Sequence, residues 1–274
     1  MIRLNLESAI DDSYPQGKIL VVDDNKLNLK VFKSLLKHTM INICEAESGQ
    51  ECIDILRKEK VDMVFLDHMM PGMDGIDTFR VIKAEGLNKD TPIIMLTANA
   101  IIGDKEKYME EGFDDFISKP IMLEELEELI LNYLPKELVE NCDCTEADSN
   151  IKELPMLDEF DFEYALNILR DEALLINILK DFGDSLDVLK QKLSSLYENI
   201  SVPDTLHKYR IEVHGLKSSA ASVGALLLSK LARLQELATI DMDYNCIHAI
   251  HPLLMCQIEK HRERIMGIYP KVDE

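Results

Sequence analysis

The sequence predicts two folded parts: an α/β domain with a five-stranded parallel sheet and helices on both faces, then an antiparallel helical bundle. Between residues 18 and 134, short β-branched runs alternate with amphipathic segments, a pattern typical of βα units. After residue 155 the strand pattern stops and helical periodicity continues. Residues 135–155 are acidic, polar and bracketed by prolines, which is the composition of a linker. The chain has 274 residues, of which 46% are hydrophobic, enough for a core in each part.

The expected elements follow from these patterns in chain order. In the first part we expect strands at 18–22, 41–46, 62–66, 93–96 and 115–118, each followed by a helix, at 26–36, 49–59, 76–84, 101–111 and 123–133. In the second part we expect helices at 160–170, 173–199, 204–223, 225–239 and 244–265. The predicted organisation is an N-terminal tail (1–17), the α/β domain (18–134), a linker (135–155), the bundle (156–268) and a C-terminal tail (269–274).

The net charge and the hydropathy of the sequence argue against two classes of partner, nucleic acid and the membrane interior. The formal net charge of −21 argues against nucleic acid, since phosphate backbones are bound by basic patches. No apolar run approaches the roughly 20 residues that span a bilayer, and no signal peptide opens the sequence. We therefore expect a cytoplasmic protein that does not insert into a membrane.

Polar side chains suited to phosphate chemistry follow four of the predicted strands. Asp23 and Asp24 follow the first strand, Asp67 the third, Thr97 the fourth and Lys119 the fifth. The carboxyl ends of parallel strands meet at one edge of a sheet, where open α/β sheets bind ligands. In a flavodoxin-like strand order, 2-1-3-4-5, the first and third strands are neighbours, so the three carboxylates are expected to lie together.

Three clustered carboxylates need a cation or must take up protons. Two carboxylates about 4 Å apart repel by roughly 4 kcal/mol at an effective dielectric constant near 20. Oxygen ligands suit Mg²⁺, while Lys119 and the Thr97 hydroxyl can stabilise phosphoryl oxygens. By itself, the Asp23-Asp24 pair is equally typical of an acidic helix N-terminus. The recurrence of suitable residues at the other strand ends favours the phosphate site.

The segments "VVDDN", "LDHMMPGMDG", "MLTANA" and "FISKP" resemble the signature segments of response-regulator receiver domains, and the resemblance covers residues 18–134. It implies that Asp67 accepts a phosphoryl group and that Asp23, Asp24 and the backbone carbonyl of Met69 complete an Mg²⁺ site with it. It also implies a cis Lys119-Pro120 peptide bond and an aromatic switch at Phe116, although an aromatic residue in a strand is more often simply core. Thr97 and Lys119 would bind the phosphoryl oxygens.

One histidine stands out in the second part. The apolar stripe of the helix at 204–223 includes Val213 and Leu216, and His214 lies about 100° away from it. We therefore expect His214 to be accessible to solvent, with Lys217 one turn further on to stabilise phosphoryl oxygens. A surface histidine beside a lysine is usually just a solvated face.

The sequence around His214 favours a functional role over a simple solvated face. "VHGLKSSAASVGA" resembles the motif of histidine phosphotransfer domains, in which lysine follows the histidine by three positions and glycine, here Gly224, by ten. This resemblance extends less specifically over the bundle. Ser218 departs from it, because the family usually has glycine there. Small residues near His214 would let a partner approach closely, and His207, which lacks the motif, is expected to be incidental.

These resemblances imply a phosphorelay protein like the C-terminal part of hybrid sensor histidine kinases. No segment resembles an ATP-binding site, so we expect a carrier rather than an enzyme, with a histidine kinase as phosphodonor and a downstream receiver domain as partner. Two alternatives remain: an interaction scaffold that is not phosphorylated, and a phosphohydrolase of the haloacid dehalogenase type. The hydrolase would want a second aspartate where this chain has Met69.

Overall fold

A computed structural model describes residues 12–13, 17–98, 104–134, 140–141 and 157–270. The chain divides into two compact units, Met1–Ile151 and Lys152–Glu274, so the division falls within the segment expected to be a linker. Among the described residues, no helix is both long and apolar enough to cross a bilayer.

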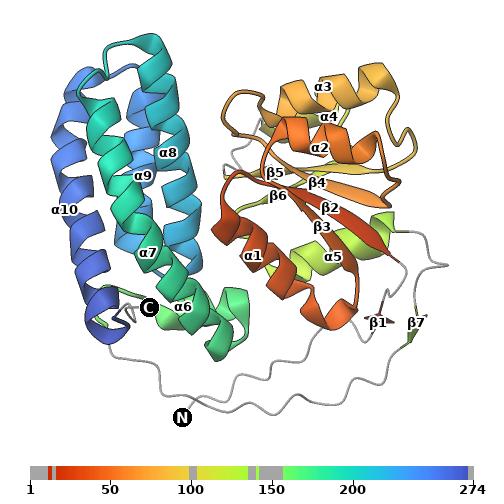
Figure 1. Cartoon of the computed structure of the whole chain (residues 1–274), viewed down its shortest axis with the longest axis horizontal. Coiled ribbons are helices and arrows are strands. Elements are labelled where there is room, and N and C mark those ends of the chain that lie inside the picture. The colour runs from red at the N-terminus through yellow and green to blue at the C-terminus, as the bar shows by residue number, and fades with distance from the viewer. Residues whose placement is uncertain (1–11, 14–16, 99–103, 135–139, 142–156, 271–274) are drawn as a thin grey trace. The chain divides into compact units, whose positions relative to one another are not determined.

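The first unit is built on a parallel sheet of five strands, shown in Figure 1. The strands are β2 (Lys18–Val22), β3 (Asn42–Ala46), β4 (Met63–Asp67), β5 (Ile93–Thr97) and β6 (Asp115–Ser118). Their order is β3-β2-β4-β5-β6, which confirms the predicted fold class and the order 2-1-3-4-5. All residues of β4 and β5 are buried, because helices cover both faces of the sheet.

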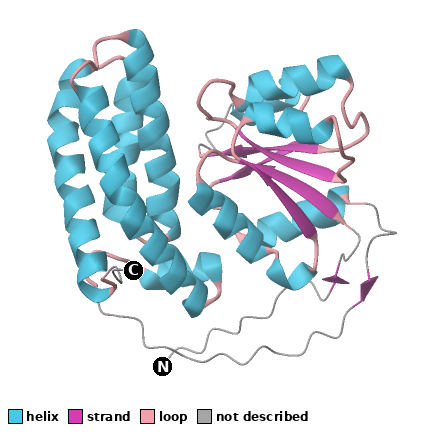
Figure 2. Cartoon of the chain, in the orientation of Figure 1, coloured by secondary structure: helices cyan, strands magenta, loops and turns pink. Residues whose placement is uncertain are grey.

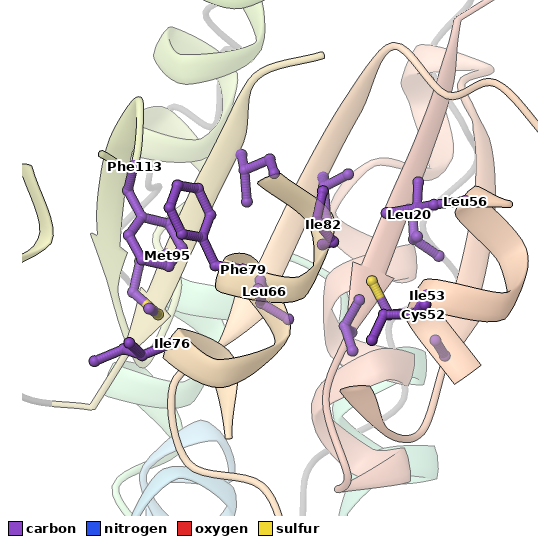
Figure 3. Packing of buried hydrophobic residues seen from close by; sticks show 14 of the residues in the cluster. Leu20, Cys52, Ile53, Leu56, Leu66, Ile76, Phe79, Ile82, Met95 and Phe113 are labelled. Atoms are coloured by element: carbon purple, nitrogen blue, oxygen red, sulfur yellow. The ribbon is translucent and has the colours of Figure 1, made fainter. Parts of the chain in front are cut away.

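Five helices pack on this sheet: α1 (Lys26–Leu35), α2 (Gly49–Leu56), α3 (Gly75–Glu85), α4 (Asp104–Glu111) and α5 (Leu123–Tyr133). A short 3₁₀ helix, η1 (Lys37–Thr39), follows α1. Figure 1 shows α1 and α5 on one face of the sheet and α2, α3 and α4 on the other. On the second face Phe79 stacks on Phe113 with ring centroids 4.0 Å apart, next to Met95 of β5 (Figure 3). The predicted helix 101–111 begins at residues outside the described ranges.

A second, two-stranded sheet was not expected from the sequence. β1 (Asp12–Ser13) pairs with β7 (Glu140–Asn141) in antiparallel fashion, so short pieces of the predicted tail and linker lie side by side. Both strands belong to the first unit. Strands of two residues are too short to show an alternating pattern, which is why periodicity could not predict them.

The second unit is helical, as Figure 2 shows. Its helices are α6 (Phe162–Leu169), α7 (Glu172–Tyr197), α8 (Pro203–Ser222), α9 (Leu226–Ile240) and α10 (Tyr244–Ile268). Each lies within three residues of a predicted helix at both ends. Asp161, Asp171 and Asp243 cap α6, α7 and α10, because their carboxylates accept hydrogen bonds from backbone N–H groups of the first turn.

Gly224 fixes the turn between α8 and α9 against the start of α6. Its φ is +78°, its carbonyl accepts a 2.8 Å hydrogen bond from Asp161 N, and a Cβ here would overlap the Asp161 carbonyl oxygen. Gly224→Ala is therefore expected to destabilise the helical unit by about 1–3 kcal/mol, because it adds backbone strain and a clash. Urea unfolding of the full chain, followed by helical circular dichroism, measures the change.

The control for this prediction is Gly267→Ala. Gly267 lies in α10, and an added methyl group would meet no atom within 4 Å, so alanine should stabilise the helix by about 0.5–1 kcal/mol. Equal unfolding midpoints for the two variants would show that the α8–α9 turn does not require glycine.

Candidate functional site

Three carboxylates gather at the carboxyl edge of the sheet. Val22 of β2 pairs with Leu66 of β4 in parallel register. Asp23 and Asp67 are the next residues along the chain after this pair, so they lie side by side. Oxygens of Asp23, Asp24 and Asp67 lie within 4.8 Å of one another. Asp23 is 1% exposed and Asp67 is 2% exposed, whereas Asp24 is half-buried. The structure therefore brings together the predicted acidic cluster.

Lys119 reaches this cluster from the end of β6. Its Nζ lies 2.5 Å from Asp23 Oδ2 and 2.5 Å from Asp67 Oδ1, and its side chain is 4% exposed. The Lys119 N–H donates a 2.7 Å hydrogen bond to the Thr97 carbonyl, which ties the loop after β6 to the end of β5. The Lys119–Pro120 peptide bond is cis, as expected.

Asp23 is held in place by the start of α1. Its Oδ1 accepts a 2.9 Å hydrogen bond from Asn25 N, and Asn28 Nδ2 lies 3.1 Å from both of its carboxylate oxygens. Asn28 was not expected from the sequence to contribute to the site. The sequence gives one indication of this contribution, because Asn28 lies in the first turn of the helix that follows Asp23 and Asp24.

One ammonium group serves two buried carboxylates, and this shortage of positive charge affects the protonation of Asp67. Burial, together with the charges of Asp23 and Asp24, raises the pKa of Asp67 from 3.8 to about 8, although Lys119 opposes the shift. Burial alone would lower the pKa of Lys119, but Asp23 and Asp67 raise it above its ordinary value. At neutral pH the site therefore favours a bound cation, since a further positive charge would stabilise the ionised form of Asp67.

The residues present fit a hard divalent cation. The cluster offers only oxygen donors, it holds more negative than positive charge, and Asp24 is half-buried while the other two aspartates are buried. Met69, the predicted source of a backbone carbonyl ligand, is half-buried two residues after Asp67. Its role as a ligand stays a prediction.

Thr97 and Phe116 lie on the neighbouring strands. Thr97 ends β5 and is 2% exposed, and its Oγ1 lies 3.2 Å from the hydroxyl of Tyr108 on α4. Phe116 on β6 is half-buried and packs against the core cluster that includes Tyr108. The hydroxyl contact of Tyr108 was missed, because an aromatic residue in a predicted helix gives no sign beyond core packing.

The loop after β4 is shaped by two glycines. Gly72 has a φ of +81°, and Gly75 begins α3, where its N–H donates a 2.9 Å hydrogen bond to the His68 carbonyl. A Cβ at Gly75 would overlap the Asp67 carbonyl oxygen and lie 3.0 Å from His68 Cα. These glycines therefore allow α3 to approach the backbone of Asp67 closely.

In the helical unit, His214 and Lys217 share a carboxylate that was not expected from the sequence. His214 Nδ1 lies 2.5 Å from Glu236 Oε1, and Lys217 Nζ lies 2.5 Å from Glu236 Oε2. Glu236 belongs to α9 and its side chain is 2% exposed. Burial alone would raise the pKa of Glu236, but the hydrogen bonds and charges of His214 and Lys217 lower it to about 2.

The expectation that His214 is accessible to solvent is wrong. Its side chain is 6% exposed and that of Lys217 is 8% exposed. The reason is Glu236, which draws both side chains towards α9, and the periodicity of α8 alone cannot show which residue of the next helix reaches it. In the sequence, this contact is indicated only by the position of Glu236, a charged residue on the apolar face of the predicted helix 225–239, because a buried charge needs a partner.

The small residues around His214 are also buried rather than presented to solvent. Ser218, Ser219, Ala221 and Ser222 are each 5–7% exposed. The Ser219 and Ser222 hydroxyls donate to the carbonyls of residues four positions earlier in α8. His207 lies on the surface, with its Nδ1 2.8 Å from Arg210 Nη2, and shares no contact with Glu236 among the hydrogen bonds found in the described part of the chain.

Comparison with known proteins identifies the first unit. Residues 19–131 match the family model of the response regulator receiver domain. The signal transduction histidine-protein kinase BarA of Escherichia coli is 34% identical over 125 residues, which cover 46% of this chain and 14% of BarA. The sensor protein GacS of Pseudomonas syringae is 33% identical, over 42% of this chain and 13% of GacS.

A third relative consists almost entirely of the matched domain. The polar-differentiation response regulator DivK of Brucella anthropi is 30% identical over 116 residues, which cover 42% of this chain and 94% of DivK. The chain thus spans most of DivK but only about one seventh of the length of BarA. The family match ends at residue 131, before the helical unit begins.

Proposed function

The chain belongs to the response regulator receiver family through residues 19–131, and from this membership we propose that it carries phosphoryl groups in a phosphorelay. Asp67 accepts a phosphoryl group in the receiver domain, and His214 carries one in the helical unit. The observation that supports the first step best is Lys119 Nζ, 2.5 Å from both Asp23 and Asp67 inside a cluster of three carboxylates.

In the first step a carboxylate oxygen of Asp67 attacks the phosphorus of the donor. The new bond joins Asp67 Oδ to phosphorus, while the bond from phosphorus to the donor atom breaks and its electron pair leaves with the donor. Lys119 then has a phosphoryl oxygen to neutralise in addition to Asp23, and the Thr97 hydroxyl donates a hydrogen bond to another. These contacts stabilise the negative charge that spreads over the transferred group.

Magnesium completes this site in the proposal. Asp23, Asp24 and the Met69 carbonyl would hold the ion together with Asp67, and bound Mg²⁺ supplies positive charge for the phosphoryl oxygens. Asn28 and the Asn25 N–H keep the Asp23 carboxylate oriented for this purpose.

In the second step His214 takes the phosphoryl group from an aspartyl phosphate. Because Glu236 is ionised at neutral pH, it can only accept, so the proton shared with His214 resides on Nδ1. Attack on phosphorus therefore falls to Nε2, and since the His214 side chain is 6% exposed, the proposal requires the surface around it to open when a receiver domain docks. The Nε2–P bond forms, the P–O bond to the aspartate breaks, and the imidazole acquires positive charge that Glu236 stabilises.

The chain in this proposal relays phosphate rather than making it from ATP. A histidine kinase supplies phosphoryl groups to Asp67, and His214 exchanges them with receiver domains, either that of this chain or that of a downstream response regulator. The direction of net flow follows from which of these partners is phosphorylated first.

The test is phosphorylation of the full chain by acetyl phosphate, followed by intact mass. We expect incorporation that depends on Mg²⁺, with an acyl phosphate that is lost in alkali and a phosphoramidate that is lost in acid. His214→Gln should lose only the acid-labile fraction. Absence of any incorporation by the wild-type chain in the presence of Mg²⁺ would overturn the proposal for Asp67, and an unchanged acid-labile fraction in His214→Gln would overturn it for His214.

A further inference from the structure

Thr97 is joined to the residue beside the acceptor aspartate by a short chain of hydrogen bonds. Tyr108 Oη lies 3.2 Å from Thr97 Oγ1 and 3.0 Å from His68 Nδ1. His68 directly follows Asp67, Thr97 ends the neighbouring strand β5, and Tyr108 lies on α4. The three side chains thus link both sides of the phosphoryl site through a residue of the covering helix.

The packing holds this tyrosine in place. Tyr108 is 2% exposed and belongs to the core cluster on the α2–α3–α4 face of the sheet. Its ring meets the His68 ring edge-on at 5.5 Å and lies 6.4 Å from the Phe116 ring. A tyrosine hydroxyl placed this deep costs free energy unless it is hydrogen-bonded, and Thr97 and His68 supply the partners.

The charges of the site favour one direction for the protons in this chain. A hydroxyl group has one proton, so Tyr108 cannot donate to both Thr97 and His68 at once. The cluster beside Thr97 holds three carboxylates and one ammonium group, and hydroxyl dipoles turn their protons towards such negative charge. The favoured order is His68 Nδ1–H to Tyr108, Tyr108 O–H to Thr97, and Thr97 O–H towards the carboxylates.

We propose that Tyr108 is a positioning residue for Thr97, which it holds with the hydroxyl proton directed at the phosphoryl site. The inference rests on the proposed function of Asp67. A hydroxyl that accepts a hydrogen bond becomes a better donor, so the bond from Tyr108 also strengthens the bond from Thr97 to a phosphoryl oxygen. Tyr108 itself does not touch the phosphoryl group.

The test is the rate of Asp67 phosphorylation by acetyl phosphate in Tyr108→Phe, which keeps the ring and removes the hydroxyl. We expect the limiting rate at saturating acetyl phosphate to fall about tenfold, the effect of losing one hydrogen bond of roughly 1.4 kcal/mol. The apparent affinity for Mg²⁺ should not change, because Asp23, Asp24 and Asp67 are all retained. The matched control is Tyr133→Phe, which removes a hydroxyl that donates to the Asp114 carbonyl at the far end of the domain from this network.

A double-mutant cycle separates positioning from general damage to the core. If Tyr108 acts through Thr97, then Tyr108→Phe should slow phosphorylation in the wild-type chain and have no further effect in Thr97→Ala. Equal slowing in both backgrounds, or no slowing in the wild type, would overturn the inference.

The His68 end of the chain gives an independent check. His68→Asn keeps an N–H donor near the position of Nδ1 and should retain most of the rate, whereas His68→Leu should resemble Tyr108→Phe. A faster rate in His68→Leu would reverse the proposed proton order and reject the inference. Failure of the wild-type chain to incorporate phosphate would instead reject the proposed function, so the two failures are distinguishable.

Discussion

Phosphorylation of the chain by acetyl phosphate should lose its alkali-labile product entirely when Asp67 is replaced by Asn. The amide keeps the size of the side chain but offers no anionic oxygen to attack phosphorus. Removal of a covalent nucleophile costs about 10⁴- to 10⁶-fold in rate, so the product should fall below detection by intact mass. Asp67 is 2% exposed and its Oδ1 lies 2.5 Å from Lys119 Nζ, so the substitution acts inside the site.

The control for this variant is Asp54→Asn. Asp54 is an aspartate on α2 whose side chain is 47% exposed and pairs with Arg57 at 3.1 Å, so the substitution makes the same chemical change outside the site. Its phosphorylation should match that of the wild type. Persistence of the alkali-labile product in Asp67→Asn, with the same yield as in Asp54→Asn, would assign the acceptor to a different residue.

The Asp67→Asn substitution should also change how the free energy of unfolding depends on pH. The pKa of Asp67 is raised from 3.8 to about 8, so the folded chain holds a proton that the unfolded chain releases between these values. The stabilisation is present below pH 3.8 and is lost as the pH rises through about 8. Urea unfolding without Mg²⁺ should therefore show a midpoint that falls with rising pH in the wild type and much less in Asp67→Asn.

Transfer through His214 should fall about 100-fold in Glu236→Ala, the size of effect expected when a reacting group loses its orientation. Glu236 fixes the Nδ1 proton of His214 and holds Lys217 beside it, and alanine removes both contacts. Glu236→Gln keeps one acceptor oxygen, which can serve Nδ1–H, and loses the charge and the second oxygen that Lys217 contacts, so we expect a smaller fall of about tenfold. The measurement is the rate at which acid-labile phosphate forms from a phosphorylated receiver domain.

A matched control comes from the same helical unit. Glu212 of α8 pairs with Lys192 at 2.5 Å, and Glu212→Gln removes a carboxylate without altering the His214 contacts described above. This variant should transfer at the wild-type rate. Similar slowing in Glu212→Gln and Glu236→Ala would indicate a general effect of charge or folding and would count against a role for Glu236.

Glu236 should also make the helical unit sensitive to acid. Its pKa is lowered from 4.5 to about 2, so the unfolded chain binds a proton that the folded chain excludes. The stabilisation is present above pH 4.5 and is lost as the pH falls towards about 2. Helical circular dichroism should show less acid unfolding in this window for Glu236→Gln than for the wild type, measured from each variant's own stability at neutral pH.

The sequence allowed most of the receiver site to be predicted because its residues mark the ends of strands. Asp23, Asp67 and Thr97 each come at the end of a run of buried apolar residues. Lys119 follows the shorter and more polar β6, and parallel topology brings all four positions to one edge of the sheet. Their convergence needs no knowledge of side-chain packing. The sheet order places β5 between β4 and β6, so the contact between Lys119 and Asp67 also needs the length of the lysine side chain.

Contacts between helices could not be predicted in the same way. The periodicity of α8 places His214 off its apolar stripe, but only the packing of α9 on α8 reveals that Glu236 lies opposite it. Tyr108 is a similar case, since its hydroxyl meets Thr97 only because α4 packs over β5. The periodicity of one helix shows which of its faces is buried. It does not show which residue of another element that face will contact.

Close approach of α3 to the acceptor strand limits how the receiver domain can respond to a bound phosphoryl group. No methyl group fits between Gly75 and the Asp67 carbonyl, so the peptide plane at the acceptor has almost no freedom to tilt towards that helix. If Asp67 is phosphorylated as proposed, we expect the domain to adjust through the Asp67 side-chain torsions and through β5 and β6, rather than through movement of α3.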